Sequence, residues 1–346
     1  MRFLPTDEQS DFARTLRALL GAADVPAAVR AWAGGEHGPG RALWSRLAGT
    51  GLFALAAPED CDGVGLLPLE LSLGFVELGR AGVPGPVVET AAASVLLSEL
   101  GDRGPAKRFV PGLAAGEASA TLTLPGGSPY ALDADAATYC FTVSATGELR
   151  LSAGGAGAGG AAGGAGAGGG AGAGGGAVLA SLDPARRLSV PAGGELLAAG
   201  PAVTAAAQTA TRWARLLTAA QCLGVGEALL AATVEYAKQR TQFGAPIGSF
   251  QAVKHRLADT LLGLEFARPL LWAAALSTEA GDVAAAKLTA GEAAYAAART
   301  ALQLHGAVGY TEELDLSLWL RKARPLRDAW GTPSACRAAV LRARER

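Results

Sequence analysis

From about Val203 to its C-terminus, the chain consists of long Ala- and Leu-rich runs that strongly favour helices over strands. Ala and Leu have high helix propensity, and the apolar residues recur at helical spacing. The runs are Thr204 to Gln239, Gln251 to Glu279, Val283 to His305 and Thr332 to Arg344. Four helices in succession predict an antiparallel C-terminal four-helix bundle over residues 201–346.

The N-terminal region, residues 1–115, also has a helical pattern. Thr6 and Gln9 have the spacing of a capping box, and apolar residues follow at helical intervals from Phe12. Two further helices with an apolar face are expected over Leu69 to Leu78 and Val87 to Leu100. These patterns predict an N-terminal helical domain.

The middle region, residues 116–200, reads instead as a small β domain. Short β-branched and aromatic runs such as Tyr139 to Val143 are bounded by Gly, Pro and Asp. Thr146 to Glu148 predicts a turn, with Leu149 to Leu151 as the returning strand of a hairpin. Residues 153–177 are only Ala and Gly, which indicates a flexible linker or letters that stand for unidentified residues. The fold class expected for the whole chain is α+β, mainly α.

Composition excludes several classes of partner. The 346 residues include 30 Lys and Arg against 31 Asp and Glu, so the basic surface of a nucleic-acid-binding protein is not expected. The N-terminus has no apolar signal-peptide core, and apolar stretches are interrupted before a membrane-spanning length, so we expect a cytoplasmic protein that does not bind membranes. Four scattered Cys and three His predict free thiols and no metal site.

One segment between two predicted helices is unusually specific: Arg240-Thr241-Gln242-Phe243-Gly244-Ala245-Pro246-Ile247-Gly248-Ser249-Phe250-Gln251. An Arg at a helix end can pair with a diphosphate, while Gln and Phe offer a hydrogen bond and a flat apolar face to a heterocycle. The alternative is an ordinary turn between helices, broken by Gly244 and Pro246. The string resembles the Arg-x-Gln-Phe-Gly-x-x-Ile-x-x-Phe-Gln signature of the acyl-CoA dehydrogenase family.

A second segment strengthens the resemblance. Gln303 to Tyr310 is similar to the family's Gln-x-x-Gly-Gly-x-Gly-Tyr, although Ala307 replaces one Gly, and by itself it could be a helix C-cap. Pro58 to Gly65 is similar to a stretch of the family's N-terminal domain, so the resemblance covers nearly the whole chain. It implies FAD as cofactor, an acyl-CoA substrate, and a homo- or hetero-oligomer in which neighbouring subunits share the FAD. The cofactor-binding residues implied are Arg240, Gln242, Phe243, Gln303, Gly306, Gly309 and Thr332.

The sequence departs from the family where the catalytic base is expected. The family's reaction needs a carboxylate to take the α-proton of the thioester, and in many members this is a Glu directly before a Gly-Thr. Here Trp330 precedes Gly331-Thr332, and Trp has no proton-accepting group. Some members carry the base just ahead of an Arg that matches Arg215, but that position is Ala214. The catalytic residue is therefore unknown from the sequence.

Three functions remain open. In the first, the chain is one subunit of a heteromeric acyl-CoA dehydrogenase, acting on a thioester such as one of a steroid side chain, and a partner subunit supplies the base. In the second, it is a complete homo-oligomeric enzyme with a displaced carboxylate, for which Glu312, Glu313 and Asp328 are the nearest candidates in sequence. In the third, it is a non-catalytic binding or scaffold protein on the same fold.

Overall fold

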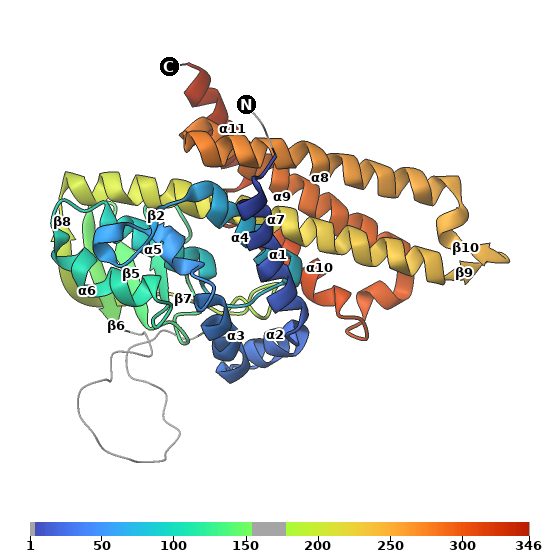
Figure 1. Ribbon diagram of the computed structural model, residues 1–346, viewed down its shortest axis with the longest axis horizontal. Coiled ribbons are helices and arrows are strands. Elements are labelled where there is room, and N and C mark those ends of the chain that lie inside the picture. The colour runs from blue at the N-terminus through green and yellow to red at the C-terminus, as the bar shows by residue number, and fades with distance from the viewer. Residues whose placement is uncertain (1–3, 154–177, 346) are drawn as a thin grey trace, which may run out of the picture. The chain divides into compact units, whose positions relative to one another are not determined.

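The computed structural model describes residues 4–153 and 178–345, which form a mainly helical chain with a four-stranded sheet in the middle of the sequence (Figure 1). The chain packs as two compact units. The bundle unit consists of Met1–Val29, Pro68–Val83 and Arg215–Arg346, and the sheet unit of Arg30–Leu67 and Pro84–Ala214. Packing therefore does not follow the three regions of the sequence, because N-terminal helices belong to the bundle unit.

Helices account for almost all of the bundle unit. Its central helix is α9, which contacts α8, α10 and α11. Many of its buried residues are Ala or Gly, among them Ala290, Gly291 and Ala294, and such small side chains let neighbouring helices approach closely. The helices are α1 (Asp7–Gly21), α4 (Pro68–Ala81), α8 (Gln251–Ser277), α9 (Ala280–His305), α10 (Leu316–Asp328), α11 (Pro333–Arg344) and, from Arg215 on, α7 (Pro201–Gln239); α2 (Val25–Ala33) is divided between the units.

The predicted start of α1 is confirmed in detail. The Thr6 side chain accepts a hydrogen bond from the Gln9 amide, and the Gln9 side chain accepts one from the Thr6 amide, which completes the capping box. Gln9 Nε2 also donates to Glu70 Oε1 over 2.8 Å. Since Glu70 lies on α4, the same residue both caps α1 and joins it to a neighbouring helix of the bundle unit.

Two glycines allow α4 and α7 to cross with their backbones in contact. A Cβ atom placed on Gly224 of α7 would lie 1.9 Å from the Val76 carbonyl oxygen, and one on Gly79 of α4 would lie 2.2 Å from the Gln221 carbonyl oxygen. Distances this short are impossible for real atoms, so any side chain here would force the helices apart. Glycine at both positions is therefore required by packing, although it lowers helix propensity.

The sheet unit combines helices with a sheet of strand order β3-β5-β6-β8. β5 and β6 form the predicted hairpin, with Val143 paired to Leu149 and Gly147 in the turn at φ 77°. Thr90 of α5 donates through Oγ1 to the Ala120 carbonyl, which attaches that helix to β3. The elements are α3 (Gly38–Ala48), α5 (Val87–Ser98), α6 (Arg103–Ala114), η1 (Phe53–Leu55), η2 (Glu59–Cys61), β1 (Ala56–Ala57), β2 (Gly65–Leu66), β3 (Ala120–Thr123), β4 (Ala131–Leu132), β5 (Tyr139–Val143), β6 (Glu148–Ala153), β7 (Leu188–Ser189) and β8 (Ala192–Ala199).

Sequence patterns missed several elements, among them α10 and β8. α10 makes the C-terminal region a set of five helices rather than the expected four, and its Arg- and Lys-rich sequence with Pro325 inside hides the helical pattern. β8 has the sequence AGGELLAA, which lacks β-branched and aromatic residues, and it is a strand because β6 pairs with it. Ala153 ends β6, and the rest of the Ala/Gly run lies outside the described residues.

One correction concerns α7, since no apolar stretch of membrane-spanning length was expected. Within the described residues, this helix is the one element long and apolar enough to cross a bilayer, by length and composition. In the protein, however, 67% of its most apolar stretch is buried. Burial against other parts of the chain is typical of a core helix of a globular fold.

Buried Asp133 in the sheet unit makes stability depend on pH. Burial raises the pKa of its carboxyl to about 7, although Oδ1 accepts a hydrogen bond from the Arg187 amide. Between about pH 4 and pH 7 the folded state holds a proton that the unfolded state has released, so the free energy of unfolding falls as pH rises. The total decrease in the free energy of unfolding over this pH range should be on the order of 4 kcal/mol.

Asp133→Asn should remove this loss, because Asn cannot ionise and tolerates the φ of 52° found here. Urea unfolding at pH 5 and pH 8 would measure it, and the variant should gain stability relative to the native protein only at the higher pH. Identical pH profiles for the two proteins would show that Asp133 does not carry the effect.

Candidate functional site

The specific segment forms a small hairpin at one end of the bundle unit (Figure 1). After α7 ends at Gln239, β9 (Thr241–Gln242) pairs with β10 (Ala245–Pro246), and η3 (Ile247–Ser249) leads into α8. The two residues of the turn, Phe243 and Gly244, have φ values of 55° and 78°. Positive φ at both central residues is typical of a type I′ hairpin, so the conformation is defined although the loop is exposed.

The side chains of this hairpin are presented to solvent. Phe243 stands at the tip with 94% of its surface exposed, and its ring meets Phe250 edge to face with centroids 6.3 Å apart. Gln242 Nε2 donates to the neighbouring Thr241 carbonyl over 3.0 Å, which leaves its amide oxygen available. Within the described residues no ion pair of Arg240 is found, although its backbone accepts from Ile247. An exposed aromatic ring beside an uncompensated guanidinium suits a planar anionic ligand.

The glycine-bearing turn lies at the same end of the bundle unit. α9 ends at His305, and η4 (Gly306–Tyr310) follows, with Gly306 at φ 63° as the helix cap. Tyr236, from the last turn of α7, stacks on His305 with ring centroids 4.1 Å apart and donates its hydroxyl to the His305 carbonyl. Gln303 accepts a hydrogen bond from Arg256 near the start of α8. The structure thus brings the ends of α7 and α9 together with the start of α8.

Gly309 in this turn is crowded. A Cβ atom there would lie 3.1 Å from the His305 Cβ and 3.3 Å from the Leu302 carbonyl oxygen. Burial lowers the pKa of His305, whose Nδ1 lies 2.8 Å from the Ala301 carbonyl. The His305 ring is therefore held as a neutral packing element beneath the turn, and we assign it no catalytic part.

Thr332 lies away from the other predicted cofactor residues. Lys287 of α9 donates through Nζ to the Gly331 carbonyl, which places the Gly331-Thr332 turn beside the first half of that helix. His305 follows Lys287 by 18 positions in one continuous helix, a rise of about 27 Å. A single chain therefore presents the predicted residues as two separate groups, Thr332 and the other six.

The turn that contains Trp330 is held by two cations, the half-buried Arg215 and the buried Lys287. Arg215 Nε donates to the Trp330 carbonyl over 2.7 Å, and Lys287 Nζ donates to the Arg327 carbonyl over 2.7 Å. Burial lowers the pKa of Lys287, whose residue surface is 1% exposed. Trp330 itself is in the left-handed region at φ 57°, and such a conformation persists only where its surroundings determine it. The backbone around Trp330, where the resemblance led us to expect a Glu, is thus fixed.

The last helix begins with a side-chain cap at Thr332. Thr332 Oγ1 accepts from the Ala335 amide over 3.3 Å, with Pro333 in the first turn of α11. Lys287 was not predicted to support this turn. The sequence held only a weak sign of this role. Lys287 is a single Lys inside an Ala-rich helical run, and a Lys in such a run is normally expected to face solvent. Only the packing of α9 against α10 and α11 shows that it points inward.

The three carboxylates considered as displaced bases are paired with arginines or exposed to solvent. Glu312 pairs with Arg321 over 2.7 Å and keeps 77% of its side-chain surface exposed. Asp328 lies 3.6 Å from Arg327, and Glu313 is exposed. No group of three or more His, Cys, Asp or Glu that could hold a metal ion occurs among the described residues.

Comparison with known proteins gives the same family at both ends of the chain. Residues 6–117 match the N-terminal domain of acyl-CoA dehydrogenase, and residues 204–343 match its C-terminal domain. The chain is 34% identical over 327 residues to acyl-CoA dehydrogenase IpdE2 of Mycobacterium tuberculosis, a match that covers 92% of each protein. Proteins of this family are flavoprotein oxidoreductases that bind FAD.

Two solved structures share the whole fold. A structure of PigA with FAD and proline superposes with a TM-score of 0.82 at 20% identity, covering 100% of this chain and 99% of that one. The ChsE4-ChsE5 complex from Mycobacterium tuberculosis gives a TM-score of 0.80 at 24% identity, covering 100% and 99%. The expected architecture of N-terminal helices, middle sheet and C-terminal helices is therefore confirmed, and the chain belongs to the acyl-CoA dehydrogenase family.

Proposed function

We propose that this chain is an FAD-binding subunit of a heteromeric acyl-CoA dehydrogenase and that a partner subunit supplies the catalytic base. The observation that carries the proposal is Trp330, which occupies the family's Glu position in a turn fixed by Arg215 and Lys287. An indole cannot accept the α-proton of a thioester. A turn that is held in place but carries no base fits a subunit that keeps the conformation of the site and cannot itself remove the α-proton.

The exposed residues at the end of the bundle fit FAD. Arg240 has no ion pair within the described part of the chain and can pair with the diphosphate, while Phe243 and the free amide oxygen of Gln242 suit the heterocycle. Gly306 is exposed, and a Cβ atom there would meet nothing within 4 Å, so the backbone of the turn can come close to the ligand, whereas the buried Gly309 packs against His305. Bound there, FAD would supply an acceptor for the hydride that leaves the β-carbon of the acyl chain.

Sharing of FAD between subunits explains the separation within one chain. Thr332 lies near Lys287, and about 27 Å of α9 separates Lys287 from His305, which precedes Gly306 and Gly309. Two copies, or this chain and a related one, can each contribute one group of residues to the same FAD. The ChsE4-ChsE5 complex is an example of two different chains of this fold in one assembly.

The alternative with a displaced base within this chain has less support. Glu312 is neutralised by Arg321 and exposed, and a general base works best where water is excluded and its pKa is shifted towards neutrality. We also propose a cytoplasmic location. Four free and buried thiols, with the pKa of Cys140 raised by burial to about 11, agree with a reducing compartment.

The proposal is tested by activity with and without a partner. The chain should be purified alone and in complex with a family member that carries the Glu, then supplied with FAD, an electron acceptor and either a straight-chain or a steroid side-chain CoA thioester. We expect turnover only by the complex, and Glu→Gln in the partner should reduce it by about 10²-fold or more. Turnover by this chain alone would contradict the proposal.

A further inference from the structure

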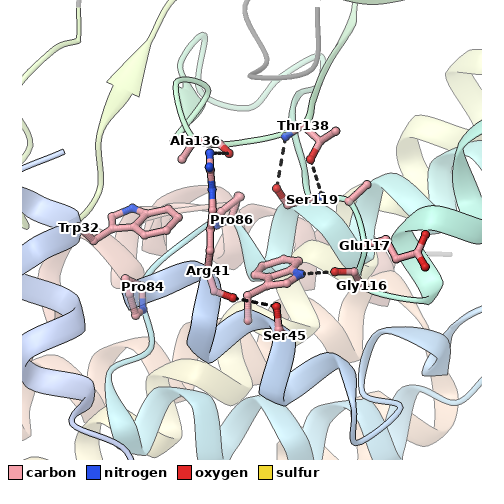
Figure 2. A pocket seen from close by; sticks show the side chains of 13 residues that line it. Trp32, Arg41, Ser45, Pro84, Pro86, Gly116, Glu117, Ser119, Ala136 and Thr138 are labelled. Carbon is pink, nitrogen blue, oxygen red and sulfur yellow. Dashed lines mark hydrogen bonds between the residues drawn. The ribbon is translucent and has the colours of Figure 1, made fainter. Parts of the chain in front are cut away.

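The sheet unit contains a cavity of about 340 Å³, lined by none of the predicted cofactor residues (Figure 2). α3 forms one side of it, the segment 116–119 before β3 another, and residues between β4 and β5 a third. A cavity of this volume is within the range that holds small molecules. Because every lining residue belongs to the sheet unit, the cavity does not depend on how the two units are arranged.

The aromatic walls of this cavity are fixed before any ligand binds. Trp44 stacks on Phe53 with centroids 4.3 Å apart and donates Nε1 to the Gly116 carbonyl over 3.0 Å. Trp32 is 4% exposed and lies so close to Gly40 that a Cβ atom there would be 2.3 Å from its ring. Both indoles are thus held by packing, and the half-buried Trp44 offers a ligand a rigid apolar surface without a large ordering cost.

Arg41 brings an uncompensated positive charge to the cavity. Its Nη2 donates to the Ala136 carbonyl over 3.4 Å, and within the described residues it has no ion pair. Several other arginines of the sheet unit do have acidic partners: Arg108 pairs with Glu195, and Arg187 with Asp135. A guanidinium has five N–H donors and binds carboxylates with two of them in parallel, so Arg41 has capacity left for an anion.

Glu117 limits how much negative charge the cavity accepts. In Figure 2, Arg41 lies between Trp32 and Glu117 along the lining of the pocket. Glu117 is exposed, and no hydrogen bond or ion pair of its side chain is found in the described part of the chain. A ligand with one negative charge near Arg41 is attracted, whereas a second charge on the same ligand would be repelled by this carboxylate.

We propose that this cavity is a binding site for aromatic monocarboxylates. The carboxylate pairs with the Arg41 guanidinium, and the ring lies against the half-buried Trp44 indole, where aromatic contacts are favourable. The site is independent of the FAD-binding residues, so it is present in the chain whether or not the proposed dehydrogenase function holds.

Titration calorimetry with 2-naphthoate tests the site on the full-length chain. We expect saturable binding of one molecule per chain, and Arg41→Gln should weaken it about tenfold or more, because a charge-assisted bidentate pair is lost. Lys107→Gln is the matched control: it removes an exposed positive charge from α6, which does not line the cavity, and binding should be unchanged. Arg41→Lys keeps the positive charge but lacks the planar guanidinium, so its affinity for 2-naphthoate should lie between those of the native chain and Arg41→Gln.

Two related probes separate the contributions of ring and charge. 2-Naphthylmethanol keeps the ring without the charge and should bind about tenfold more weakly than 2-naphthoate to the native chain, and equally weakly to Arg41→Gln. 2-Naphthyl phosphate, a dianion, should bind more weakly than 2-naphthoate. Glu117→Gln should reduce the difference in affinity between these two ligands. Equal binding of 2-naphthoate by the native chain and Arg41→Gln, or no saturable binding at all, would overturn the proposal.

Discussion

Gly224→Ala is expected to destabilise the bundle unit by about 3 kcal/mol or more, the largest stability loss we predict for a single methyl group in this chain. The new Cβ would lie 1.9 Å from the Val76 carbonyl oxygen and 2.6 Å from the Arg80 amide nitrogen, both of them backbone atoms of α4. Backbone atoms cannot rotate away as a side chain can, so α4 and α7 must separate. Thermal unfolding should show the melting temperature lowered by about 5 °C or more.

Gly263→Ala is the control for this prediction. Gly263 is also inside a long helix, α8, but its new Cβ would meet nothing closer than the Ala293 Cβ at 3.9 Å. The gain in helix propensity should then raise stability by up to about 1 kcal/mol. Opposite shifts for the two variants would establish the close crossing of α4 and α7, whereas a melting temperature of Gly224→Ala equal to that of the native chain would contradict it.

Arg240→Ala is expected to weaken FAD binding by the assembled protein about 10- to 100-fold. Hydrogen bonds to a charged group contribute about 1.5–3 kcal/mol, and Arg240 has no acidic partner in the described part of the chain that would compete for its guanidinium. Fluorescence titration of the protein with FAD measures the dissociation constant directly. Added salt should weaken FAD binding by the native protein more than FAD binding by the variant, because part of the attraction between Arg240 and FAD is electrostatic.

Lys238→Ala is the matched control for Arg240→Ala. It lies in the last turn of α7, carries the same charge and pairs with Glu235 over 2.7 Å in an exposed ion pair. Its removal should leave the affinity for FAD nearly unchanged. If both variants weaken FAD binding equally, the loss of affinity reflects the change in net charge rather than a contact with Arg240. The assignment of Arg240 to the cofactor would then be wrong.

Local signals in the sequence predicted much of the fold, because they depend on neighbours along the chain. The capping box of Thr6 and Gln9 and the turn at Gly147 are decided within a few residues, and both occur as expected. β8 could not be found in this way, since its Ala and Gly residues become a strand only by pairing with β6. The two-unit packing was also beyond reach, because α1 and α4 join a bundle that lies far away in sequence.

The candidate site shows the same division. The helix cap at Gly306 was expected from turn chemistry, and the segment from Thr241 to Pro246 was expected to connect two helices, although its hairpin was not predicted. The support beneath Trp330 was not predicted either, because the inward orientation of Lys287 depends on helices that contact α9 from several sides. The sequence also gave no sign of the cavity beside Arg41, whose walls come from four separated segments.

The account depends most on whether one FAD is gripped by the bundle-end hairpin and the glycine-bearing turn of this chain. A structure of the assembled protein with FAD bound, determined by crystallography or electron microscopy, measures this directly. We predict that Arg240, Gln303 and the backbone at Gly306 contact an FAD, while the Thr332 turn of the same chain faces a different FAD. An FAD far from Arg240 and Gln303 in every subunit of the assembly would contradict the account.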